Sequence, residues 1–259
     1  MDDVRCLSDS LMEGRAHASR GAVEAASYIC RRLSAVGYQT SLQTFRTGKG
    51  VGRNIIAVHK GDPRSDRYIL VCAHYDGLGM MNGRVYPGAD CNASGVAVLL
   101  FLAEELKTSG KNFVFAALDA HYQDLAGATA LSESGLWTFS MVVNLDTVGS
   151  TLAPPNKYRP DFMIVLGGKQ YEKSLEEANC ASRLRLYYDY YRSKSFTDYF
   201  YSKISDQAPF LAKKVPAVMF TSGITMNTNK TTDSAQTLDY DILDKRSVLI
   251  LNWLCSLKI

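Results

Sequence analysis

Residues 68–76 read Tyr-Ile-Leu-Val-Cys-Ala-His-Tyr-Asp, and residues 88–95 read Gly-Ala-Asp-Cys-Asn-Ala-Ser-Gly. The first stretch is an apolar run of strand length that ends in His-x-Asp, and the second leads into a helical pattern that continues to Leu106. Open α/β sheets bind their ligands outside the carboxyl ends of the strands, so an imidazole and carboxylates placed there are typical of a metal site. These two stretches therefore predict a metal-centred hydrolase scaffold.

Outside these stretches, apolar segments with strand and helix periods alternate along the chain. Strands are expected at 38–46, 53–59, 67–73, 112–120, 141–146, 162–166 and 217–220. Helices are expected at 2–13, 21–36, 93–108, near 170–181 and 206–213, and at 240–257. Because such alternation is typical of a sheet covered on both faces, we expect an α/β fold. It is expected as one domain, residues 1–259, forming a three-layer α/β/α sandwich with a mostly parallel mixed sheet.

The composition of the 259 residues is ordinary for a globular protein, with 46% hydrophobic and 21% charged residues. A net charge of +3 without any basic run argues against nucleic acid as a partner. The longest fully apolar run, residues 96–103, is far shorter than the roughly 20 residues that span a bilayer, so no membrane span is expected. Residues 1–5 show no leader pattern, so no signal peptide is expected in this chain. Six widely spaced cysteines predict buried free thiols rather than a disulfide framework.

Four segments together resemble the motifs of peptidase family M28, the zinc-dependent exopeptidases that include bacterial leucyl aminopeptidases. They are residues 74–76 (His-Tyr-Asp), 88–95, 144–146 (Asn-Leu-Asp) and 205–210 (Ser-Asp-Gln-Ala-Pro-Phe). Residues 13–15 and 54–58 also fit, so the resemblance runs from about residue 10 to 240. It implies a zinc exopeptidase-like fold and cleavage of residues from peptide N-termini.

The resemblance also implies a set of metal ligands. His74 and Asp146 match two ligands of one zinc ion, and Asp90 matches the aspartate that bridges two zinc ions in the family. Asp76 would lie behind His74 as the carboxylate that orients its imidazole. Three protein ligands and an open position are typical of catalytic zinc. We therefore expect one zinc ion at His74, Asp90 and Asp146.

The second metal position of the family departs from its pattern in this chain. The family has two glutamates, a general base and a zinc ligand, where His121 and Tyr122 stand here, and its last histidine ligand corresponds to Asn229. A phenol with a pKa near 10 is a poor zinc ligand. A neutral amide oxygen suits calcium better than zinc. A second zinc ion is therefore not expected.

His121 stands at the position of the family base, and three interpretations remain open. Its imidazole is suitable as the general base of a mononuclear hydrolase. Alternatively, His121 and Tyr122 fill space in a decayed site, or His121 itself ligates the metal.

Cys91 directly follows Asp90. Adjacent residues rarely both reach one metal, so a packed thiol is favoured over a ligand at Cys91. In relatives the peptide bond after the bridging aspartate is often cis; if this feature is kept here, the Asp90–Cys91 bond would be cis.

These patterns favour a metal-dependent hydrolase of the aminopeptidase type that acts on a peptide or a small amide, with His121 and Asp76 as its catalytic side chains. The alternative is a pseudopeptidase that uses the same fold to bind without turnover. A one-zinc acyl-transfer enzyme like the glutaminyl cyclases is less favoured, because those enzymes keep the glutamate and the final histidine. Relatives are frequently exported, so the resemblance implies export to the periplasm or cell surface.

Overall fold

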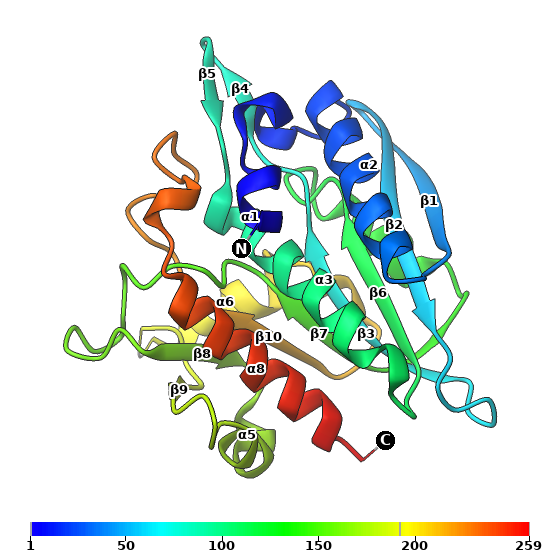
Figure 1. The fold of residues 1–259 in the computed structure, drawn as a ribbon, viewed down its shortest axis with the longest axis vertical. Coiled ribbons are helices and arrows are strands. Elements are labelled where there is room, and N and C mark those ends of the chain that lie inside the picture. The colour runs from blue at the N-terminus through cyan, green and yellow to red at the C-terminus, as the bar shows by residue number, and fades with distance from the viewer. Residues whose placement is uncertain (1, 192, 259) are drawn as a thin grey trace.

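The computed structural model describes residues 2–191 and 193–258 (Figure 1). An eight-stranded sheet lies at its centre, in the order β1-β2-β6-β3-β7-β10-β8-β9. The strands span Thr40–Thr47 (β1), Gly50–His59 (β2), Arg67–His74 (β3), Phe113–Leu118 (β6), Thr138–Leu145 (β7), Phe162–Leu166 (β8), Arg185–Tyr187 (β9) and Ala217–Thr221 (β10). β6, β3, β7 and β10 run parallel, as do β8 and β9, whereas the β1–β2, β2–β6 and β10–β8 pairs are antiparallel. The expected mixed, mostly parallel sheet is therefore confirmed.

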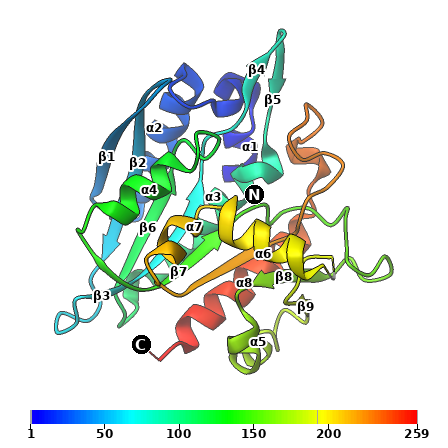
Figure 2. The same cartoon turned by 180° about the vertical axis from the view of Figure 1, so that it is seen from behind.

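Helices cover both faces of this sheet. α1, α2, α3, α5 and α8 lie on the face toward the viewer in Figure 1, and α4, α6 and α7 lie on the face toward the viewer in Figure 2. They span Asp2–Leu7 (α1), Arg20–Ala35 (α2), Gly95–Glu105 (α3), Ala126–Glu133 (α4), Glu172–Ala178 (α5), Lys194–Lys203 (α6), Ala208–Ala212 (α7) and Tyr240–Ser256 (α8). This is the expected three-layer α/β/α sandwich. Within the described residues, no helix combines the length and the apolar character needed to cross a membrane.

The central strand β3 shows why its sequence reads as a continuous apolar run. Ile69, Val71 and Ala73 pack into the core beneath α3 and α8, and Leu70 and Cys72 pack into the core beneath α4 and α7. Successive side chains of a strand point to opposite faces, so a strand covered on both sides needs apolar residues at every position. The polar residues begin at His74, the last residue of the strand, which is itself buried.

The helix expected at 2–13 is divided into two pieces. α1 ends at Leu7, and a separate 3-10 turn spans Ser10–Arg15. The Asp9 carboxylate accepts the backbone N–H of Leu11 at 2.9 Å and so caps the second piece. Gly14 has a φ of +66°, and a Cβ there would lie 2.4 Å from the carbonyl oxygen of Gly79. The chain must turn at this point, which the apolar pattern alone did not reveal.

Three elements were not expected from the sequence: α4, α6, and a small hairpin of β4 (Gly79–Met81) and β5 (Arg84–Tyr86). The hairpin extends away from the main sheet at the top of Figure 1. α4 follows a polar loop in which Ala120, Asp124 and Leu125 have positive φ. Each of these elements is short or lies in a segment rich in polar and aromatic residues, where periodicity is weak.

Two leucines test the assignment of the core. Leu99 in α3 is fully buried, whereas Leu11 is 81% exposed. We expect Leu99→Ala to lower the free energy of unfolding by about 2–5 kcal/mol, because it leaves a cavity in the core. Leu11→Ala should change it by no more than about 0.5 kcal/mol. Urea unfolding of the two variants measures both values, and equal losses would contradict the assignment.

Candidate metal centre and active site

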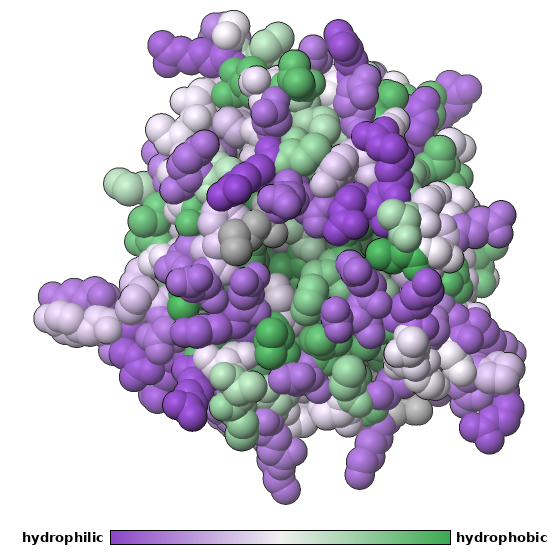
Figure 3. Space-filling view, viewed as in Figure 1, coloured by the Kyte–Doolittle hydropathy of each residue, from purple (hydrophilic) through white to green (hydrophobic). Residues whose placement is uncertain are grey.

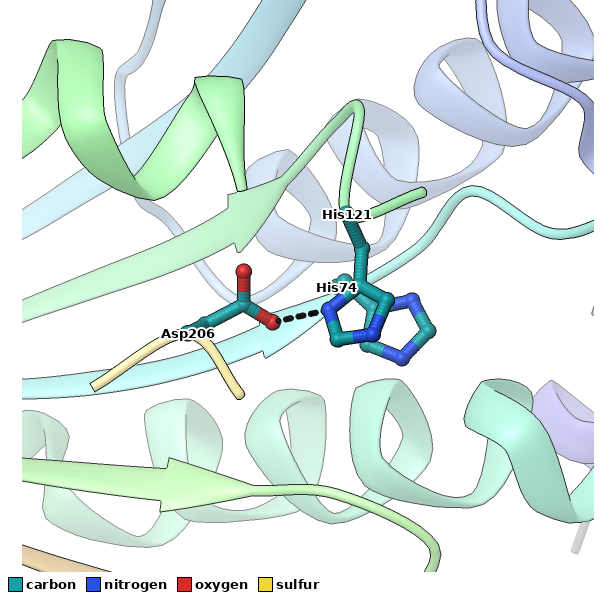
Figure 4. A group of neighbouring side chains, drawn as sticks. All are labelled: His74, His121 and Asp206. Atoms are coloured by element: carbon teal, nitrogen blue, oxygen red, sulfur yellow. Dashed lines mark hydrogen bonds and ion pairs between the residues drawn. The ribbon is translucent and has the colours of Figure 1, made fainter. Parts of the chain in front are cut away.

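The candidate site lies at the carboxyl ends of the neighbouring strands β6, β3 and β7. His74 is the last residue of β3, and Asp146 directly follows β7. His121 lies in the loop after β6. Because these parallel strands end at the same edge of the sheet, the three side chains converge there from distant parts of the sequence. Figure 4 shows His74 and His121 side by side at this edge, with Asp206 reaching them from the loop before α7.

His74 is held in a single orientation by the turn that follows it. Its Nδ1 lies 3.0 Å from the backbone carbonyl oxygen of Asp76, so Nδ1–H donates to this acceptor. Nε2 then points toward Asp146, whose Oδ1 lies 3.7 Å away, and has no hydrogen-bond partner in the described part of the chain. A fully buried ring nitrogen without a partner is the atom that a metal ion would take.

Asp76 acts on two neighbours. Its backbone carbonyl accepts from His74 Nδ1 and so orients the imidazole. Its side-chain Oδ1 accepts the backbone N–H of His121 at 3.1 Å. The same Oδ1 lies 3.5 Å from His74 Nδ1. The buried carboxylate therefore fixes the loop after β6 as well as the imidazole. Its distance from the ring fits the expected orienting role better than a role in direct contact with substrate.

The charges at this edge reinforce one another. Although burial opposes the charged form of His74, the neighbouring carboxylates of Asp146 and Asp76 raise the pKa of its imidazole well above the usual value. Burial also opposes the charge of Asp146, but His74 lowers the pKa of that carboxyl to about 2. Ser205 stabilises the same carboxylate by donating to its Oδ2 at 2.6 Å. Asp146 is therefore an anion ready to accept a cation.

Asp90, expected as the third ligand, does not join His74 and Asp146. Potential ligand atoms of His74, Cys91 and Asp146 lie within 4.8 Å of one another, and Asp90 belongs to no such group among the described residues. The Asp90 Oδ1 instead accepts the backbone N–H groups of Gly149 and Ser150, at 2.7 and 3.2 Å. Burial and the neighbouring Asp233 raise the pKa of Asp90 to about 7. Its carboxyl group supports the loop after β7.

The backbone around Cys91 is irregular. A cis peptide bond lies at Cys91–Asn92 and not at Asp90–Cys91. Asp233 accepts the backbone N–H of Asp90 at 2.8 Å and that of Cys91 at 3.0 Å. The sequence indicated that only one of the adjacent side chains of Asp90 and Cys91 would face His74. In the structure it is the thiol of Cys91 and not the carboxylate of Asp90. Burial raises the pKa of this thiol in the metal-free protein.

His121 stacks on His74 and is paired with Asp206. The two imidazole rings have centroids 4.0 Å apart and an angle of 14° between their planes. His121 Nδ1 lies 3.0 Å from Oδ2 of Asp206, which is fully buried (Figure 4). Asp206 stood within one of the quoted sequence motifs, but nothing in the sequence connected it with His121. Only the strand order brings the two together.

Tyr122 and Asn229 contact each other where the second metal position of the family would lie. Tyr122 donates its phenolic O–H to Oδ1 of Asn229 at 2.7 Å, and its oxygen lies 3.2 Å from Cys91 Sγ. Burial raises the pKa of Tyr122, which keeps the phenol protonated. The small cavity beside these residues, which Leu78, Tyr86 and Asp233 also line, has a volume of about 10 Å³, enough for a single water molecule. The two side chains that replace the family's ligands are thus hydrogen-bonded to each other.

The residues at this edge fit one zinc ion. Nitrogen, sulfur and carboxylate oxygen are the ligand types that zinc takes in proteins. His74, Cys91 and Asp146 offer one of each, and all three are buried. The unpartnered Nε2 of His74 is the observation that makes this more than a chance cluster.

Arg15 joins the two loops that carry these residues. Its side chain is fully buried and donates to the backbone carbonyls of Leu7, Tyr75, Pro87 and Gly88. Tyr75 follows His74 directly, and Gly88 lies three residues before Cys91. The guanidinium therefore fixes the distance between the end of β3 and the loop of Cys91.

The fold and this site define the chain as a zinc-peptidase-like α/β protein. A zinc aminopeptidase from Bacillus subtilis has the same fold, with a TM-score of 0.78 and 14% identity over 98% of this chain and 93% of that one. A glutaminyl cyclase from Porphyromonas gingivalis is also similar, with a TM-score of 0.75 and 17% identity over 98% and 96% of the two chains. Residues 54–254 match the profile of peptidase family M28. The chain belongs to this family.

Two curated relatives are similar to part of this chain. A probable zinc metalloprotease from Pyricularia oryzae is 31% identical over 135 residues, which are 48% of this chain and 27% of that protein. The alkaline phosphatase isozyme conversion protein of Escherichia coli is 25% identical over 163 residues, 52% of this chain and 47% of that protein. The matched part is thus less than half of the length of either relative. The family and these relatives support a metal cofactor, with zinc as the expected ion.

Replacement of Arg15 tests its bracing role. Arg15→Met would leave four carbonyl oxygens, two of them buried and two partly buried, without this donor, so we expect the free energy of unfolding to fall by at least about 3 kcal/mol. Arg64→Met removes an exposed arginine that pairs only with Asp62 two residues away, and should change stability by less than about 1 kcal/mol. Chemical unfolding of both variants gives the comparison. Equal losses of unfolding free energy in the two variants would show that Arg15 does not hold the two loops together.

Proposed function

We propose that this chain is a zinc-dependent hydrolase that cleaves the N-terminal residue from peptides and uses one metal ion. The supporting observation is the buried His74 Nε2, which has no partner within the described residues and faces the anionic Asp146. Membership of peptidase family M28 indicates peptide substrates. The exopeptidase preference and the single ion are our inferences from the residues present.

His121 is proposed as the general base. Because the Asp206 carboxylate only accepts, His121 donates from Nδ1 and keeps a lone pair on Nε2 for a proton. Asp206 also compensates the charge that His121 gains on taking this proton, as the carboxylate of a catalytic triad does. A zinc ion bound beside it would supply Lewis-acid activation of water and of the scissile carbonyl.

The stacking of the two imidazoles disfavours His121 as a ligand of the same ion. A ring nitrogen binds a metal in the plane of its own ring, and the planes of His74 and His121 are nearly parallel at a centroid distance of 4.0 Å. Ligand atoms of His74, His121 and Asp206 do lie within 4.8 Å of one another, but an ion shared by the two stacked rings would lie out of the plane of at least one of them. We therefore favour the base over the ligand for His121.

The pseudopeptidase is the second candidate, and one specific observation favours it. The hydroxyl group of Tyr122 occupies the space beside Cys91 and is hydrogen-bonded to Asn229. A site closed in this way, without a bound ion, would serve to bind a peptide without turnover. The two candidates differ first in metal content.

Elemental analysis of protein purified without chelator and loaded with zinc tests the metal site. We expect about one zinc ion per chain, lost in His74→Ala because the ion would lose its nitrogen ligand. His59→Ala is the matched control, since His59 Nε2 contacts only the carbonyl oxygen of Ser109 at the far end of the sheet. Two ions per chain would contradict the single site. A metal-free parent would favour the pseudopeptidase.

Kinetics with aminoacyl p-nitroanilides test the proposed base. His121→Ala should lower kcat by about 10²–10⁴-fold, the range of general-base catalysis, with the zinc content unchanged. Asp206→Asn should lower kcat less, because the amide still holds the ring but cannot compensate its charge. His59→Ala again serves as control. If the parent and His121→Ala hydrolyse the substrate at the same background rate, the hydrolase proposal fails.

A further inference from the structure

Cys91 lies against the proposed metal position and not in an ordinary apolar core. Its sulfur is within 4.8 Å of a ring nitrogen of His74 and of a carboxylate oxygen of Asp146. Free cysteines usually pack among apolar side chains. Here a nitrogen, a carboxylate, a phenol and an amide surround the sulfur, which is the environment of a ligand.

The polar neighbours of the sulfur are the two side chains that stand in place of the second metal's ligands. Tyr122 Oη lies 3.2 Å and Asn229 Oδ1 3.9 Å from Cys91 Sγ, and Tyr122 and Asn229 are hydrogen-bonded to each other. A hydroxyl group can rotate and donate to a thiolate, which stabilises the negative charge of a coordinating sulfur. Tyr122 would then be the hydrogen-bond donor to a sulfur ligand.

The neighbouring carboxyl group of Asp90 is held by one of its two oxygens, and its buried Oδ2 has no partner within the described residues. Its Oδ1 accepts two backbone N–H groups and faces the Ser94 hydroxyl, 3.3 Å away. Turning Asp90 toward His74 would break these bonds and leave buried N–H groups without acceptors. The thiol needs no such rearrangement.

We propose that Cys91, and not Asp90, is the third protein ligand of the metal, so that the centre is a mononuclear site of imidazole, carboxylate and thiolate. This inference rests on the single metal site proposed above. A thiolate favours thiophilic and borderline ions such as zinc and cobalt over magnesium, calcium and manganese, which prefer oxygen ligands. Metal binding deprotonates a coordinating thiol outright.

Cobalt(II) provides a direct test that does not depend on activity. A thiolate bound to cobalt(II) gives an intense charge-transfer absorption in the near ultraviolet, which imidazole and carboxylate ligands do not give. We expect this band in the cobalt-loaded parent, with about one cobalt ion per chain, and its loss in Cys91→Ser. The zinc affinity of Cys91→Ser should fall by at least about 100-fold, since loss of an outer partner alone costs 10–100-fold.

Two matched variants control for the thiol and for the carboxylate. Cys72→Ala removes another fully buried thiol, two residues before His74 in β3, and should keep both the band and the metal. Asp90→Asn preserves an oxygen acceptor for the N–H groups of Gly149 and Ser150, and should also keep the band. Thermal unfolding of each apo variant shows whether it is folded before loading.

Each outcome decides a different claim. A parent that binds one cobalt ion without the charge-transfer band, or a band that persists in Cys91→Ser, overturns Cys91 as a ligand but leaves the one-metal site intact. Loss of the metal in Asp90→Asn with its retention in Cys91→Ser returns the ligand role to Asp90. A folded parent that binds no cobalt and no zinc overturns both this inference and the proposed metal centre.

Discussion

The buried guanidinium of Arg15 is the interaction on which the geometry of the site depends. A charged group removed from water is stable only if its donors are satisfied, and Arg15 achieves this with backbone carbonyls from three separate segments. Burial lowers the pKa of this arginine, and the nearby carboxylates of Asp233 and Asp76 oppose that shift. Because Arg15 requires all of its acceptors, it holds the loop after β3 and the loop of Cys91 in one arrangement. The early turn around Gly14 is what brings Arg15 to this position.

Two buried carboxylates, Asp233 and Asp90, also hold the loops that carry the site residues. Asp233 accepts the backbone N–H groups of Asp90 and Cys91, and Asp90 in turn accepts those of the loop after β7. The chain from Asp233 through Asp90 to Gly149 connects the C-terminal part of the protein with the strand that carries Asp146. Metal sites need ligands fixed to within a fraction of an ångström, and here the fixing is done by backbone hydrogen bonds. The proposed ligands therefore have little freedom of their own.

The sequence was sufficient for the fold and for two of the side chains at the site. The continuous apolar run of β3, which ends at His74, predicted a strand with helices on both faces and a polar residue at its carboxyl end. The apolar run of β7 followed by Asp146 predicted the same arrangement. The choice between Asp90 and Cys91 could not be made in this way. Which of two adjacent side chains faces a neighbour depends on the backbone angles of an irregular loop, and Cys91 and Asn92 have non-helical angles. The pairing of His121 with Asp206 joins residues 85 positions apart and is set by the tertiary structure alone.

Charge balance favours the proposed single divalent ion over two. Asp146 and a deprotonated Cys91 would together carry two negative charges, which match the two positive charges of one zinc ion. Asp206 is paired with His121, and so compensates the charge of the proposed base. A second ion would have only the phenol of Tyr122 and the amide of Asn229 as further partners, and both are neutral. Since a buried ion without compensating charge is costly, we expect these neutral side chains to disfavour a second ion.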